Sequence, residues 1–238
     1  MIKDPQIFIV YEPGMMGTFF CNLLLFQETL INDHSRNLKW AGDEHSEYNA
    51  HGTLYKDPLK NFHTFTDFKK IKDKDWTSFF APLENKGISI HSLPSWEFLR
   101  LDYTKYFSNY VIGLIAPSKD NCSAWADRSL QSTHTGHLKT EWWYKNVRDI
   151  TKVPKEFIDG MRMKERKKYL QSQYEIIENT KMPDRTVHFD LDFIEIESIQ
   201  EFCDQCCKTL GIKCFDLPHG LVSQFLEKNK IFFDKLPK

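Results

Sequence analysis

The order of elements in the first thirty residues is the feature that most constrains the fold. Residues 7–11 form a short β-branched and aromatic run, which predicts a buried strand. A Glu-Pro-Gly break at residues 12–14 ends this strand, because neither a strand nor a helix tolerates that sequence. Apolar residues then continue from residue 19 to residue 30 without Gly or Pro, which predicts a helix. A strand, a Gly-containing loop and a buried helix are typical of the first half of a βαβ unit.

The rest of the chain alternates strand and helix patterns in the same way. Strands are predicted at residues 88–91, 110–115 and 185–189, and helices at residues 95–101, 119–130, within 141–174, and at 197–210, where Gly211 is the expected helix end. This alternation predicts a three-layer α/β/α fold with a mainly parallel sheet of four or five strands. Residues 32–87 are polar and rich in turn signals, so we expect them to form an insertion within a single domain of residues 1–238.

Composition and charge exclude several classes of partner. Lys and Arg number 32 against 33 Asp and Glu, so the net charge of −1 gives no overall attraction to nucleic acid or to anionic lipid. The apolar stretch at residues 19–26 is too short to cross a bilayer, and the first residues lack the order of a signal peptide. We therefore expect a cytoplasmic protein that binds neither nucleic acid nor membrane. The sequence leaves its oligomeric state open.

Two groups of residues raise the question of a metal site. Cys203 and Cys206 have the spacing of a first zinc-ligand pair, but no second pair or nearby His completes the set, so buried helix thiols are favoured. His134, His137 and Glu141 fall within eight residues, in a segment whose small and polar residues indicate a loop. No metal is expected.

The loop between the first strand and the first helix could bind phosphate. Backbone N–H groups in such a loop point at an anion, and the helix N-terminus adds a partial positive charge. Gly14 and Gly17 allow close approach of the backbone, and the Thr18 hydroxyl could donate to a phosphate oxygen. The loop lacks the Gly-Lys-Ser/Thr of a Walker A motif. A plain turn therefore remains an alternative.

Four segments, taken in order, match the sequence pattern of one enzyme family. Residues 17–20, Gly-Thr-Phe-Phe, stand where the family has Gly-Thr-Thr-Trp, and residues 88–94 look like its strand ending in Thr-His-Leu-Pro, with one residue added after His91. Residues 111–123 are similar to a strand followed by Arg-Asp-Pro and a later Ser, and residues 187–191 and 210–212 look like its Tyr-Glu-Asp-Leu and Phe-Leu-Gly segments. In these segments the chain resembles the sulfotransferases that use 3′-phosphoadenosine 5′-phosphosulfate (PAPS).

This resemblance implies a P-loop sulfotransferase-like fold and a role for particular residues. PAPS would be the co-substrate, PAP the product, and a small molecule or glycan with a hydroxyl or amine the acceptor. His91 matches the base that deprotonates the acceptor, which suits an imidazole at neutral pH. Ser123 matches the serine that binds the 3′-phosphate. The 5′-phosphosulfate would lie on the first loop, at Gly14, Met16, Gly17, Thr18 and Phe19.

Two departures from the family pattern leave the function open. The loop cation of the family falls at Met15, and the strand-end Arg that pairs with the 3′-phosphate falls at Ile115. A phosphate without these cations loses charge-assisted hydrogen bonds. Arg128, five residues after Ser123, is the expected replacement. The alternatives are a catalytically silent nucleotide-binding or structural protein of the same fold, and a nucleotide or nucleoside kinase-like phosphotransferase.

Overall fold

A four-stranded parallel sheet forms the centre of the molecule, with the strand order β2-β1-β3-β4. The computed structural model describes residues 1–12, 15–25, 88–93, 95–125, 155–214 and 216–234. Every strand pairing in this part of the chain is parallel, which confirms the α/β class. The insertion expected at residues 32–87 lies outside the described residues. The strands are β1 (Gln6–Val10), β2 (Ser89–Leu93), β3 (Tyr110–Ala116) and β4 (Thr186–Asp190).

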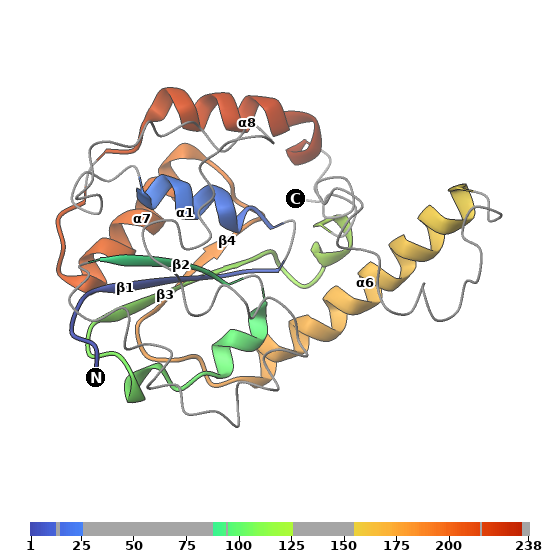
Figure 1. Cartoon of the computed structure of the whole chain (residues 1–238). Coiled ribbons are helices and arrows are strands. Elements are labelled where there is room, and N and C mark those ends of the chain that lie inside the picture. The colour runs from blue at the N-terminus through green and yellow to red at the C-terminus, as the bar shows by residue number, and fades with distance from the viewer. Residues whose placement is uncertain (13–14, 26–87, 94, 126–154, 215, 235–238) are drawn as a thin grey trace.

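Helices cover both faces of this sheet (Figure 1). On one face lie α1 (Gly17–Leu25), α7 (Ile196–Leu210) and, outside them, α8 (His219–Phe233). On the other face lie the 3-10 helices η3 (Trp96–Arg100) and η4 (Tyr103–Lys105) and the long helix α6 (Lys155–Asn179). The described part of the chain is therefore a sheet between two helical layers.

The burial of the strands explains their sequences. All five residues of β1 and all seven of β3 are buried, as expected for parallel strands whose two faces are both covered. Aromatic rings fill both layers: the Phe8 ring lies 4.9 Å from that of Tyr103 on the η4 side, and the Phe20 ring lies 4.5 Å from that of Phe189 on the α1 side. The high aromatic content of the chain thus serves the core.

Helix α7 forms where the sequence predicts a helix. Its buried face repeats at helical spacing, and it ends at Gly211, whose φ of 71° is in the left-handed region that favours glycine. Cys203, Cys206 and Cys207 all lie on this buried face. Within the described ranges no group of three or more His, Cys, Asp or Glu residues could hold a metal ion.

Three segments differ from the sequence-based expectation. Residues 95–101, expected as a helix, form the shorter 3-10 helix η3, whose N-cap Ser95 accepts a hydrogen bond from the Glu97 N–H. Helix α6 begins at Lys155 and runs to Asn179, past the end of the predicted helical segment. Helix α8 was not predicted. No helix in the described part of the chain is both long enough and apolar enough to cross a bilayer.

Candidate functional site at the carboxyl edge of the sheet

The strand order places a ligand site at the carboxyl end of β1. From β1 the chain passes through α1 to β2 on one side, and then to β3 on the other side of β1. Ligands in open α/β sheets bind outside the carboxyl ends of the strands, at the point where the strand order reverses. The loop that the sequence singled out starts at this point. The carboxyl edge, which we define by the residues that follow β1, β3 and β4, is therefore the candidate site.

The loop after β1 turns sharply into α1. Its Met15 N–H donates to the Glu12 carbonyl over 3.0 Å, and Met16 has a φ of 60°, which is uncommon for a residue other than glycine. Helix α1 begins at the next residue, Gly17. The first N–H groups of a helix have no partner within it, and they carry its partial positive charge. The N-terminus of α1 thus lies at the carboxyl edge, next to the end of β1.

The side chains of this loop are packed into the core. Met15 is fully buried, and Met16 and Tyr11 are 7% and 4% exposed. A Cβ atom added at Gly17 would lie 2.0 Å from the ring of Tyr11. Contact with Tyr11 therefore requires a glycine at position 17. This reason differs from the one expected from the sequence, which was close approach of a phosphate. The ring of Phe19 stacks on that of Phe225 in α8 at 3.9 Å, so this side chain belongs to the core as well.

The structure brings some of the predicted phosphate-binding residues to one edge. The backbone of Gly17, Thr18 and Phe19 forms the first turn of α1 after β1. Ser123 lies half-buried in the helical turn that follows the neighbouring strand β3. Gly14 and Arg128 lie outside the described residues, so their predicted roles stay predictions.

His91 occupies the middle of β2, within the core. Its side chain is 1% exposed and stacks on the Phe8 ring at 4.7 Å, with an angle of 17° between the rings. Its Nε2 donates to Oε1 of Gln6 over 2.8 Å. Leu93, two residues further on, ends the strand at the carboxyl edge. The role of His91 as the base stays a prediction, and its buried position gives that role no support.

Sequence reasoning missed Glu12, which is fully buried where β1 ends. Its Oε1 accepts a hydrogen bond from the Trp96 N–H over 3.1 Å, and the Trp96 indole donates to the Ile115 carbonyl over 3.3 Å. These bonds join the ends of β1, β2 and β3. A charged residue directly before a Pro-Gly turn gives no sequence signal of burial, because such turns normally lie in solvent.

Asp192 connects the ends of β3 and β4. Its Oδ2 accepts a hydrogen bond from the Ser118 N–H over 3.0 Å, and its own N–H donates to Oδ1 of Asp190 over 2.9 Å. The other carboxylate oxygen of Asp192, Oδ1, is buried and has no hydrogen-bond partner in the described structure. For the kinase-like alternative, either Asp190 or Asp192 would be the candidate carboxylate for Mg²⁺. In the residues that the structure describes, neither belongs to a group of three or more possible metal ligands.

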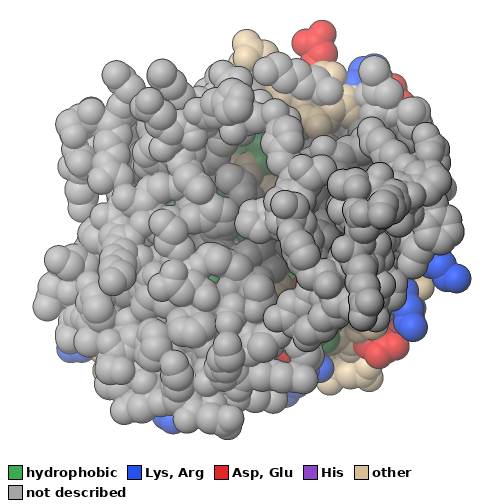
Figure 2. Space-filling model, turned by 45° about the vertical axis from the view of Figure 1, so that its right-hand side comes forward, with side chains coloured by type: hydrophobic (Ala, Val, Ile, Leu, Met, Phe, Trp, Pro, Cys, Tyr) green, Lys and Arg blue, Asp and Glu red, His purple; other side chains and the backbone are tan. Residues whose placement is uncertain are grey.

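Two carboxylates of this edge act on Cys122. The pKa of its thiol is raised to about 12, mainly by burial and additionally by the charges of Asp192 and Glu12. Lys119 lies nearby, but its ammonium pairs with both carboxylate oxygens of Glu178 at 2.9 Å. Figure 2 shows acidic and basic side chains of the described residues near one another on the right-hand rim of that view. Among the residues that the structure describes, the carboxyl edge offers backbone donors and carboxylate acceptors rather than a cluster of cations.

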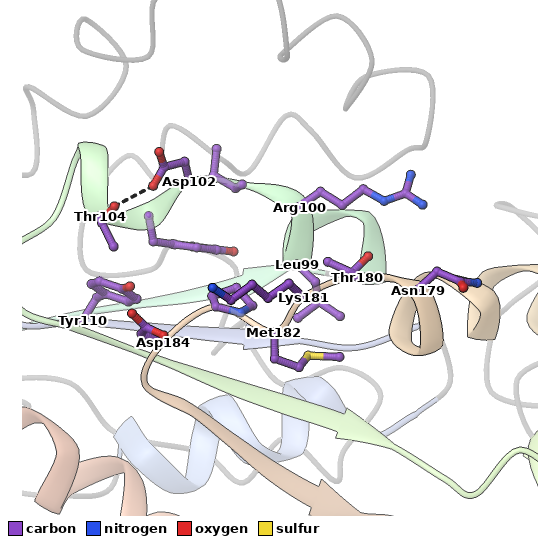
Figure 3. A pocket seen from close by; sticks show the side chains of 13 residues that line it. Leu99, Arg100, Asp102, Thr104, Tyr110, Asn179, Thr180, Lys181, Met182 and Asp184 are labelled. Atoms are coloured by element: carbon purple, nitrogen blue, oxygen red, sulfur yellow. Dashed lines mark hydrogen bonds between the residues drawn. The ribbon is translucent and has the colours of Figure 1, made fainter.

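A groove of about 550 Å³ lies at the opposite, amino edge of the sheet. Figure 3 shows that its side chains come from η3, η4, the start of β3 and the segment between α6 and β4. Because β3 has seven residues, the end of the groove at Tyr110 is about 20 Å from the carboxyl end of this strand. Its lining consists of Leu99, Arg100, Leu101, Asp102, Tyr103, Thr104, Tyr110, Asn179, Thr180, Lys181, Met182, Pro183 and Asp184.

Several polar side chains of this groove have partners within the protein. Thr104 donates to Asp102 over 2.7 Å, and Arg100 binds both carboxylate oxygens of Glu97. The ring of Tyr110 stacks on that of Tyr103, and the Arg185 guanidinium lies 5.6 Å from the centre of the Tyr110 ring. Partners within the protein already satisfy these groups.

Comparison with known proteins adds no relative. The chain matches no family model, no curated protein and no solved structure. A functional assignment therefore rests on the residues and geometry described above.

Proposed function

We propose that this protein is a sulfotransferase-like protein that binds PAPS at the carboxyl edge and transfers its sulfuryl group to a hydroxyl or amine acceptor. The observation that carries the proposal is the position of the loop. Helix α1 begins at Gly17, after the strand β1 at which the strand order reverses, and residues 17–20 are the segment that resembles the phosphosulfate loop of the family. A P-loop sulfotransferase-like topology is part of the same proposal.

The chain supplies two groups suited to the phosphates. The N–H groups of the first turn of α1 would bind the 5′-phosphosulfate, aided by the helix dipole. Ser123, which follows the neighbouring strand, would bind the 3′-phosphate through its hydroxyl. The acceptor oxygen or nitrogen forms a bond to sulfur, the bond from sulfur to the bridging phosphate oxygen breaks, and PAP leaves with that electron pair. The acceptor proton passes to a base, for which His91 is the candidate given by resemblance.

A second candidate, a catalytically silent protein of the same fold, is favoured by the packing of the loop. Met15, which stands at the position of the family cation, is fully buried, and Met16 and His91 are also buried. A protein that had lost PAPS binding would still need this packing for stability. The two candidates share the fold and differ in the response to nucleotide.

Thermal unfolding with and without PAP and PAPS separates the two candidates. A ligand at 100 times its Kd stabilises the folded protein by about 2.7 kcal/mol, which raises the Tm by several degrees. The proposal expects such a rise with PAP and with PAPS, and release of PAP when PAPS is supplied with hydroxyl and amine acceptors. ATP with Mg²⁺ serves as the control for the kinase-like alternative.

Each outcome decides between the candidates. A rise in Tm with PAP and turnover of PAPS support the transferase. Binding of PAP without turnover supports a silent nucleotide-binding protein. No change in Tm at millimolar PAP or PAPS contradicts nucleotide binding and leaves a structural role for the fold. A response to ATP and Mg²⁺ alone would favour the kinase-like alternative.

A further inference from the structure

One carboxylate oxygen at the carboxyl edge is held in place but not used. Asp192 is fixed through Oδ2, which accepts from the Ser118 N–H, while its Oδ1 is buried without a hydrogen-bond partner in the described part of the chain. A buried acceptor without a donor is costly, and native proteins seldom keep one without a reason. The Ser118–Asp192 bond ties together the segments after β3 and β4, so the orientation of the carboxylate is fixed.

The surroundings of Asp192 favour a neutral donor over an anion. The pKa of the nearby Cys122 thiol is raised mainly by burial, and the charges of Asp192 and Glu12 raise it as well. Burial also raises the pKa of Tyr174, and nearby Asp190 and Asp192 add to the effect. A phosphate or sulfate oxygen placed directly against Oδ1 of Asp192 would be repelled. An N–H or O–H group would form a charge-assisted hydrogen bond.

We propose that Oδ1 of Asp192 accepts a hydrogen bond from the nucleoside part of the bound nucleotide and thereby determines nucleotide specificity. This inference rests on the proposed function, because it takes the 5′-phosphosulfate to lie at the N-terminus of α1. Asp192 follows β4, two strands away from β1, which is a lateral separation of about 10 Å. A nucleotide that extends from the end of β1 across the end of β3 brings its nucleoside, and not its 5′-phosphate, to Asp192.

Two groups of the adenosine moiety have the required chemistry. The exocyclic amine of adenine and the 2′-hydroxyl of the ribose are both neutral donors. Each is absent from one analogue of PAP: the inosine analogue has a carbonyl in place of the amine, and the 2′-deoxy analogue has no 2′-hydroxyl. Comparison of the three ligands therefore identifies which donor Asp192 binds.

The test is calorimetric titration of wild type, Asp192→Asn and Asp184→Asn with PAP and with both analogues. Asn at position 192 can keep the bond from Ser118 N–H through its oxygen, but it directs an amide NH₂ toward the ligand in place of an acceptor. Asp184→Asn changes an exposed carboxylate at the amino edge and serves as the matched control. Unfolding without ligand shows whether each variant folds, and the analogue series with wild type needs no variant.

We expect Asp192→Asn to bind PAP about 10- to 100-fold more weakly than wild type, which is the effect of a lost hydrogen bond to a charged group. Wild type should bind one of the two analogues more weakly than PAP by a similar factor. Asp192→Asn should bind that analogue about as well as it binds PAP, since the same hydrogen bond is already absent. Asp184→Asn should bind like wild type.

Two results would overturn this role while the proposed function stands. One is equal binding of PAP by wild type and a folded Asp192→Asn. The other is equal binding of PAP and both analogues by wild type. Failure of wild type to bind PAP at all would overturn the proposed function and the role of Asp192 together.

Discussion

The two edges of the sheet differ in how their polar groups are satisfied. At the carboxyl edge Glu12 is fully buried, and Oδ1 of Asp192 is buried without a partner in the described structure. At the amino edge a groove is present, but its Asp102 and Arg100 already bond to neighbouring side chains. In the described residues the groove and the unpaired buried acceptor therefore lie in different parts of the molecule.

This difference shows which edge to associate with function. A surface groove whose groups are already paired gains little from a ligand, because new bonds replace existing ones. A buried acceptor gains the full bond when a ligand arrives, and the first N–H groups of a helix have no partner within the helix itself. The carboxyl edge has a buried acceptor and a helix N-terminus, and the strand order reverses there.

The largest expected effect comes from His91, which lies between the two edges. We expect His91→Ala to lower the free energy of unfolding by about 3 kcal/mol, since it removes the ring stacked on Phe8 and leaves Oε1 of Gln6 without its donor. Denaturant unfolding measures this. His91→Phe, which keeps a ring but not the hydrogen bond, should lose less. A His91→Ala variant as stable as wild type that has lost PAPS turnover would restore His91 as the base and contradict its structural role.

Tight packing at the carboxyl edge predicts a nearly equal effect at Gly17. We expect Gly17→Ala to cost about 2–3 kcal/mol, because the added methyl group overlaps the buried ring of Tyr11. Gly220→Ala in α8 is the matched control: its added Cβ meets no atom within 4 Å, and it should stabilise the helix by about 0.5–1 kcal/mol. Equal unfolding midpoints for Gly17→Ala and wild type would show that the loop is not packed as described.

The acidity of the carboxyl edge predicts a pH dependence through Cys122. Its pKa is raised from the ordinary value of 9.0 to about 12, mainly by burial, so the unfolded chain loses this proton at a lower pH than the folded protein. The Cys122 thiol makes its full contribution to the free energy of unfolding below pH 9. This contribution falls as the pH rises toward 12, by about 1.4 kcal/mol per pH unit. Unfolding of wild type and Cys122→Ala between pH 8 and 11 should show a shallower decline in the variant. Parallel curves would place the thiol in solvent.

The smallest effect is expected at the amino edge. Thr104 and Asp102 are exposed, so the hydrogen bond between them competes with water. Thr104→Ala should change the free energy of unfolding by less than about 0.5 kcal/mol and leave PAP binding unchanged. Weakened PAP binding in this variant would assign the nucleotide to the groove and reverse the comparison of the two edges.

Sequence-based prediction of helices and strands was most accurate where residue type, pattern and turn residues all indicated the same element. Strands β1 and β3 were found because long runs of apolar residues indicate parallel strands covered on both faces, and Gly211 marked the end of α7. His91, in the middle of β2, is buried against the ring of Phe8, so a polar residue lies in the core. No local pattern reveals which layer will cover a strand.

The candidate site was predicted only in outline. The loop and Ser123 were found through resemblance and do meet at one edge, because β1 and β3 are neighbours. The burial of Glu12 and the unpaired oxygen of Asp192 depend on contacts between residues far apart in the chain, such as the bonds to Trp96 and Ser118. Such contacts follow from the strand order, which the sequence alone did not provide.

Hydrogen exchange measured with and without PAP tests the central claim, that a nucleotide binds at the carboxyl edge, most directly. Mass spectrometry of the native protein should show slower exchange in residues 15–20 and 117–123 when PAP is added, and unchanged exchange in residues 99–104 and 179–184. Slower exchange confined to the amino-edge segments, or no change anywhere at saturating PAP, would contradict the claim.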